Sequence, residues 1–147
     1  MNLGLAFAAA SLLPLLAVPA LAAHELDNRD IARGQSLYAD HCAACHGADL
    51  KGQPDWRSPG PDGVLPAPPH DQSGHTWHHD NRLLFDYTRF GGQAALEQRG
   101  IAGFKSGMPA FGETLTEDAI WDILAFIRSS WPKRVQDMQA TRNNPDH

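Results

Sequence analysis

The sequence has few cysteines and no concentration of positive charge. It contains 2 cysteines among 147 residues, and its formal net charge is −5. Both cysteines stand in one short motif, so no thiol remains for a disulfide elsewhere. No cluster of lysine and arginine is present, which argues against a general nucleic-acid-binding protein. The length suits one modest domain.

The two cysteines lie in the pentapeptide Cys42-Ala43-Ala44-Cys45-His46. The spacing C-x-x-C-H is the attachment signature of a c-type haem, because two such thiols can form thioethers to the haem vinyl groups and the adjacent imidazole can ligate the iron. A zinc site would need further ligands at defined spacing, and the sequence has no second C-x-x-C or C-x-H. A thioredoxin-like redox motif would need a flanking strand, and none is indicated. We therefore predict one covalent haem c, attached at Cys42 and Cys45 and ligated by His46.

The first segment has the composition of an export signal. Leu3–Ala23 contains no charged residue, and Ala20 and Ala22 fit an A-x-A cleavage site. This pattern predicts a signal peptide over residues 1–22, cut after Ala22. The run is also just long enough to span a bilayer, so membrane association is expected only if the segment stays uncleaved.

A helix is predicted over residues 27–40, with Asp27 or Asn28 as its cap. Gly34 lies on its apolar face and lowers helix propensity, which makes sense if another backbone crosses closely there. The other residues of that face are Ile31, Leu37 and Tyr38.

Two further helices and a tail are predicted after the cysteine motif. Residues 80–90 form a short helix capped by Asp80, and a longer helix begins after Thr116 and stops at Pro132. We take residues 23–131 as the folded domain. Residues 132–147 are expected to be a polar, frayed C-terminal tail.

The segment between these helices and the motif is rich in proline and glycine. Residues 47–74, here called the proline-rich segment, hold six prolines and no apolar period. Such a segment cannot sustain a helix or a central strand, and we expect it to wrap one face and edge of the haem. One of its carbonyls, for which Pro68 is the candidate, should accept the His46 Nδ1–H and aim Nε2 at the metal.

An electron-carrying haem needs a second strong axial ligand. The methionines available are Met1, Met108 and Met138. Met1 leaves with the signal peptide and Met138 lies in the polar tail, whereas Met108 lies in a loop where a thioether can reach inward. Met108 is therefore the predicted second metal ligand, and its soft sulfur would favour the ferrous state.

A histidine cluster offers a rival. His75, His78 and His79 could supply the second ligand, or could bind a separate metal such as copper. The plainer interpretation is a surface cluster whose rings pack or hydrogen-bond, because no cysteine, methionine or carboxylate framework accompanies it.

With these residues in place, the chain resembles a single-haem class I cytochrome c over roughly residues 30–131. The matching motifs, in order, are Gly34-Gln35-Ser36-Leu37-Tyr38, then Cys42 to Gly47, then Gly107-Met108-Pro109-Ala110-Phe111, then Leu115-Thr116-Glu117-Asp118. The resemblance implies an all-α fold in which the first and last helices cross nearly at right angles, with short helices and the proline-rich loop around one haem. It also implies Cys42 and Cys45 as thioether residues and His46 and Met108 as the axial pair.

The function expected from the resemblance is a periplasmic one-electron carrier, a monomer that meets redox partner proteins and is not itself an enzyme. One alternative is a haem-containing subunit or enzyme of an oxidase or peroxidase type. Another is a metal-handling protein that uses His75, His78 and His79.

Overall fold

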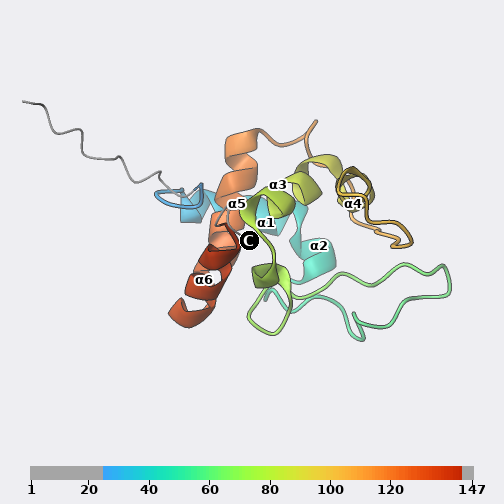
Figure 1. The fold of residues 1–147 in the computed structure, drawn as a ribbon. Coiled ribbons are helices and arrows are strands. Elements are labelled where there is room, and N and C mark those ends of the chain that lie inside the picture. The colour runs from blue at the N-terminus through green and yellow to red at the C-terminus, as the bar shows by residue number, and fades with distance from the viewer. Residues whose placement is uncertain (1–24, 144–147) are drawn as a thin grey trace, which may run out of the picture.

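The computed structural model describes residues 25–143, and within this range the chain folds into helices and loops with no strand (Figure 1). The α-helices are α1 (Ile31–His41), α2 (Ala43–His46), α3 (Asn81–Phe90), α4 (Gly92–Gln98), α5 (Glu117–Ser129) and α6 (Lys133–Ala140). Two 3-10 helices are η1 (Thr76–His78) and η2 (Thr141–Asn143). The predicted all-α class is confirmed.

The predicted signal peptide falls outside the described residues. Within residues 25–143, no helix combines the length and the apolar character needed to cross a membrane.

Helix α1 begins at Ile31, further along the chain than the predicted caps Asp27 and Asn28 would place its start. Asp30 is the cap, and its Oδ1 accepts a hydrogen bond from the backbone N–H of Arg33 at 2.9 Å. Asn28 has φ of 56°, in the left-handed region, so the helix cannot extend back through it. Asp27 and Asn28 are therefore not caps, and the prediction was wrong at this boundary.

The core is built where α1 crosses α5. A Cβ placed on Gly34 would lie 2.1 Å from the carbonyl oxygen of Asp122 and 3.0 Å from Cβ of Phe126, so the two backbones approach as closely as glycine allows. Beside it, the rings of Tyr38 and Phe126 lie 5.4 Å apart. The predicted glycine crossing is confirmed. The fully buried Ile120 and Ile123 continue this apolar core along α5.

Ion pairs hold the start of α1 against α5. Asp122 is buried. Its carboxylate accepts a hydrogen bond from the Arg33 guanidinium at 2.9 Å and another from the backbone N–H of Asp30 at 3.3 Å. Arg29 pairs with the exposed Asp118 at 2.9 Å. These contacts satisfy a buried charge at the crossing, which would otherwise cost several kilocalories per mole.

Helix α3 also packs against α5, and the predicted caps of both helices are confirmed. Asp80 Oδ1 accepts from the backbone N–H of Leu83 at 2.7 Å, and Thr116 Oγ1 accepts from Ala119 at 3.2 Å. The Phe85 and Trp121 rings stack at 4.5 Å, which joins α3 to α5. Helix α4 was not predicted, because its seven residues are too few to show a period of 3.6.

The expectation of a frayed tail after Trp131 is wrong for residues 133–143. Helix α6 packs against η1, with Val135 buried and Gln139 wholly buried. Gln139 Nε2 donates to Asn81 Oδ1 at 2.8 Å and to the carbonyl of His79 at 3.2 Å. These buried polar contacts bind α6 to the start of α3, so the last helices belong to the folded unit.

Candidate functional site

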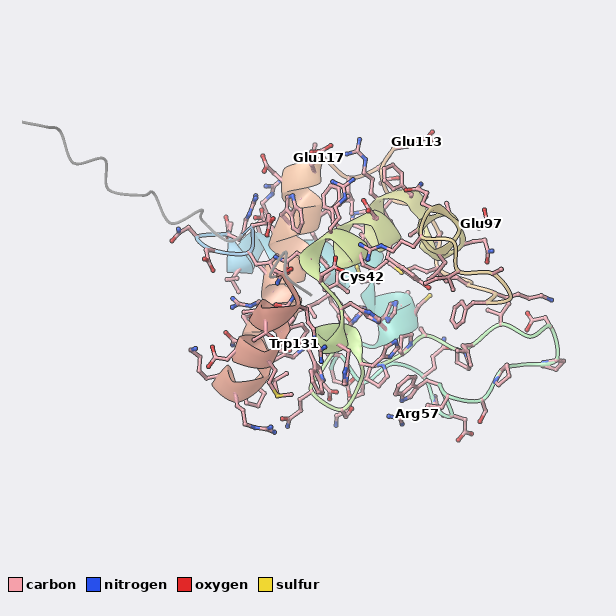
Figure 2. The ribbon with its side chains drawn as sticks, viewed as in Figure 1. Cys42, Arg57, Glu97, Glu113, Glu117 and Trp131 are labelled. Atoms are coloured by element: carbon pink, nitrogen blue, oxygen red, sulfur yellow. The ribbon has the colours of Figure 1, made fainter. Side chains whose placement is uncertain are left out.

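The cysteine motif folds as a short helical turn, α2, directly after α1. The backbone N–H of Cys42 donates to Tyr38 O and that of His46 to Cys42 O, both at 2.9 Å. Gly47 ends the turn with φ of 79°, and its carbonyl accepts the Tyr38 hydroxyl at 3.0 Å. Local helical geometry thus fixes the motif on the end of α1, near the centre of the molecule, as the labelled Cys42 shows in Figure 2.

The two thiols are both free, and they differ in exposure. Cys42 is buried and Cys45 is exposed. Burial raises the pKa of the Cys42 thiol to about 11, and the neighbouring Cys45 adds to the shift. Neither sulfur is spent on a disulfide, so both remain available for thioether bonds.

The imidazole of His46 is oriented by the proline-rich segment. The ring is buried, and Nδ1 lies 2.9 Å from the carbonyl oxygen of Pro68. A carbonyl only accepts hydrogen bonds, so Nδ1 carries the proton and the lone pair lies on Nε2. Burial lowers the pKa of His46, although the bond to Pro68 acts in the opposite direction. The predicted Pro68 contact is confirmed, and it leaves His46 in the tautomer that a metal requires.

A second histidine, which was not predicted as part of the site, lies against His46. The rings of His46 and His70 stack with centroids 4.0 Å apart and planes 26° apart. Thr76 Oγ1 donates to the carbonyl of Pro69 at 3.4 Å and accepts from His70 Nδ1 at 2.9 Å. His70 stands two residues after Pro68, and this proximity in sequence was the one available hint.

Met108 lies on the loop that follows α4, here called the methionine loop (residues 99–111). Its carbonyl accepts from the backbone N–H of Gly92 at 3.1 Å, and Phe111 N–H donates to Thr88 O at 3.0 Å. Gly91, with φ of 83°, lets the loop approach closely, because a Cβ there would lie 3.2 Å from Met108 O. The backbone of Met108 is therefore fixed to the start of α4, and Phe111 ties the end of the loop to α3. The Met108 side chain is half-buried. Met138 is on α6 with 37% of its surface exposed, while Met1 lies outside the described residues.

Each of the three histidines in the cluster packs against another ring. His75 stacks on Trp56 with planes 8° apart, and His78 stacks on Trp77 at 3.7 Å. His79 meets the edge of His75 at 5.3 Å. Within residues 25–143 no group of three or more histidine, cysteine or acidic side chains could hold a metal ion. His75, His78 and His79 therefore do not assemble into a metal site, and the metal-handling hypothesis is wrong on this point.

Residues 31–131 match the model of a protein family described as Cytochrome c. The chain belongs to the cytochrome c family. Comparison with curated proteins and with solved structures gave no match. As a member of this family the cytochrome binds haem c covalently and serves haem-based electron transfer, and Cys42, Cys45 and His46 form its C-x-x-C-H motif.

The residues of this cytochrome fit haem c. Neither thiol is in a disulfide, the two lie three positions apart in the sequence, and the neighbouring imidazole holds its proton on Nδ1. Two thiols at this spacing are suited to thioether bonds with the two haem vinyl groups, and an imidazole with a free Nε2 lone pair is suited to ligate the haem iron. Cys42 belongs to the apolar core that is built at the α1–α5 crossing, and Ala43 packs against that core.

Proposed function

We propose that this cytochrome is a periplasmic one-electron carrier whose haem iron is held between His46 and Met108. The observation that carries the proposal is the 2.9 Å contact between His46 Nδ1 and Pro68 O. It restrains the imidazole and leaves the Nε2 lone pair available to an iron, which supports the proposed ligation. A carrier needs this rigidity, because ligands that keep their positions in both oxidation states lower the reorganisation that accompanies electron transfer.

Each residue has a distinct part in this proposal. Haem c supplies an iron that changes between Fe(III) and Fe(II). Cys42 and Cys45 tether the group, so it cannot be exchanged during encounters with partners. Met108 contributes a soft thioether that favours the reduced state and raises the potential. The partners are redox proteins, and such encounters are typically small and weak.

The ligand pair is tested by optical spectroscopy of the oxidised protein. Methionine ligation to ferric haem gives a weak far-red absorption band, and we expect this band in the wild type. Met108→Ala should abolish it, while Met138→Ala, which changes an exposed methionine on α6, should leave it intact. A wild-type spectrum without the band, or a band that survives Met108→Ala, would show that Met108 is not the ligand.

The carrier role is distinguished from an oxidase or peroxidase role by exogenous ligands. With both axial positions filled by protein, cyanide and carbon monoxide should bind the resting protein slowly and weakly at neutral pH. Fast, tight binding would instead indicate an open iron and favour the enzyme. Native mass spectrometry should give a monomer with one haem.

The periplasmic location rests on the sequence of the first segment. Leu3–Ala23 is uncharged and ends in small residues. Mass spectrometry of the protein from its exporting host should find a chain that begins at or near Ala23. An intact Met1 would instead indicate that the segment is retained and anchors the protein in the membrane.

A further inference from the structure

The proline-rich segment contains a closed loop whose two ends meet beside His46. This bridging loop (residues 53–67) is pinned at its base, where Gln53 N–H donates to Ala67 O at 2.9 Å and Ala67 N–H donates to Gln53 Oε1 at 3.3 Å. Pro68, the acceptor for His46 Nδ1, follows directly. The base of the loop is therefore held next to the residue that bonds the His46 imidazole.

The base is also fixed on its other side by Gly52. Its N–H donates to the carbonyl of His46 at 2.8 Å, and its φ is 65°. A Cβ at this position would lie 2.5 Å from the carbonyl carbon of Pro68. The chain entering the bridging loop therefore packs directly on the residue that orients His46.

The tip of the bridging loop is a tight turn. Gly63 N–H donates to Gly60 O and Gly60 N–H donates to Val64 O, both at 2.9 Å. Asp62 Oδ1 accepts from the backbone N–H of Val64 at 3.0 Å. Because these three bonds close the turn on itself, the Val64 side chain is presented in one direction.

This tip contacts the methionine loop. Lys105 Nζ donates to the carbonyl of Asp62 at 3.1 Å, and the Lys105 chain passes over Gly63. A Cβ placed on Gly107 would lie 2.9 Å from Val64 Cγ1, so Val64 faces the residue immediately before Met108. Figure 1 shows the green bridging loop and the gold methionine loop approaching each other at the right of the molecule.

We propose that the bridging loop positions the methionine ligand: it joins the segment that orients His46 to the segment that carries Met108, through the contacts of Val64 and Lys105. The inference rests on the proposed His46–Met108 ligation and extends it. The far side of Met108 is anchored to the start of α4 through Gly92. On the near side, residues 101–105 are exposed, and the bridging loop supplies the support there.

The test is a double-mutant cycle on Val64 and Gly107. Gly107→Ala places a methyl group against Val64 Cγ1 and should push the methionine loop away, weakening the far-red band and lowering the temperature at which it is lost. Val64→Ala removes Cγ1 and should weaken the band less. In the Val64→Ala/Gly107→Ala protein the new methyl has room, so the band and its midpoint should recover towards the Val64→Ala values. Purely additive losses would overturn the proposal.

A second readout does not depend on the ligand. Hydrogen exchange at the backbone amides of residues 105–108 should be about five-fold faster in Val64→Ala than in the wild type, because two half-buried methyl groups no longer favour the closed loop. Lys105→Leu, which removes the hydrogen bond to Asp62 O, should also speed exchange at these amides. Its matched control is Lys51→Leu, which removes an exposed cation outside the bridging loop and should leave the exchange unchanged. Unchanged exchange in both Val64→Ala and Lys105→Leu would overturn the proposal. A wild type without the far-red band would overturn the ligand assignment instead, so the two failures are distinguishable.

Discussion

The imidazole of His70 stacks on the imidazole of His46 at a centroid distance of 4.0 Å. His70 is itself held from several sides. Its backbone N–H donates to Leu50 O at 2.7 Å, its carbonyl accepts from Trp131 Nε1 at 2.7 Å, and its ring bonds Thr76. Burial lowers the pKa of His70 well below its ordinary value, so the stacked ring is neutral. His70 therefore connects the end of α5 to the imidazole of the proposed ligand and limits how that ring can turn.

Replacing His70 should loosen His46 in graded steps. His70→Phe keeps a flat ring but loses the Thr76 bond, which costs roughly 1 kcal/mol. His70→Ala also loses the ring and leaves a cavity, so its free energy of unfolding should fall by about 2–4 kcal/mol. Denaturant titration of the haem protein gives these values.

A purely structural role predicts no change in the haem spectrum. If His70 restrains the His46 ring, electron paramagnetic resonance of the ferric protein should broaden in His70→Ala and stay narrow in His70→Phe. Equal spectra in all three proteins would show that the stack does not orient the ligand.

The approach of Gly52 to Pro68 gives a second prediction. Gly52→Ala combines a left-handed backbone with a Cβ 2.5 Å from the Pro68 carbonyl carbon, so the carbonyl must shift away from His46 Nδ1. The strain should cost roughly 1–3 kcal/mol of stability. Because the lost bond makes the imidazole a weaker donor to ferric iron, the reduction potential should rise.

Gly100→Ala is the matched control for this variant. Gly100 has φ of 71°, but nothing lies within 4 Å of an added Cβ. It should therefore share the backbone strain and leave the potential at the wild-type value. Potentiometric titration measures the reduction potential of both variants. An unchanged potential in Gly52→Ala would mean that the Pro68 hydrogen bond to His46 does not set the reduction potential.

The helix crossing gives a third prediction. An alanine at position 34 would place its Cβ 2.1 Å from the carbonyl oxygen of Asp122, and a backbone atom cannot move aside as a flexible side chain can. Gly34→Ala should therefore lower the free energy of unfolding by about 3 kcal/mol, despite the better helix propensity of alanine. Ser36→Ala, at an exposed position of the same helix, should be neutral or slightly stabilising. Thermal unfolding followed by circular dichroism measures both, and a Gly34→Ala protein as stable as the wild type would mean that the helices do not cross this closely.

The parts of this molecule that could be predicted from sequence are those set by short-range chemistry. The caps Asp80 and Thr116 and the Gly34 crossing follow from local rules on hydrogen bonding and bulk. The Pro68 contact followed from the need of a ligating imidazole for a partner at Nδ1. Each of these depends on a few neighbouring residues or on one known demand of the site.

The features that could not be predicted depend on which distant segments meet. Helix α6 has a polar sequence, and its burial comes from Gln139 reaching Asn81, a contact that no local period reveals. The His70 stack and the contact of Val64 with Gly107 likewise join segments whose approach is set by the whole fold. The histidine cluster was ambiguous for the same reason, because Trp56, which stacks on His75, comes from a different part of the chain.

The cap of α3 gives a prediction on acid stability. Burial raises the pKa of Asp80, but the hydrogen bonds from Arg99 and from Leu83 N–H outweigh it, and His79 adds to the lowering, so the pKa lies below the ordinary 3.8. A carboxyl whose pKa is lowered by folding stabilises the protein at pH values above the unfolded pKa. This stabilisation is lost as the pH falls through the lower, folded value. The structural source is the two-pronged contact of Arg99, at 3.1 and 3.2 Å.

Asp80→Asn isolates the charge from the cap. Asparagine caps a helix as well as aspartate does, so this variant loses the Arg99 charge pair and keeps the acceptor for Leu83. The stability difference between wild type and Asp80→Asn should be constant near neutral pH and shrink towards zero as the pH falls below about 4. Asp80→Ala loses the cap as well, so its free energy of unfolding should be lower by about a further 1 kcal/mol at every pH.

Asp30→Asn is the control, because Asp30 caps α1 and, within residues 25–143, no arginine side chain donates to it. Denaturant titrations across the acid range give these stability differences. If the difference between the wild type and Asp80→Asn stayed constant to pH values well below 4, Arg99 would not act on the Asp80 carboxylate.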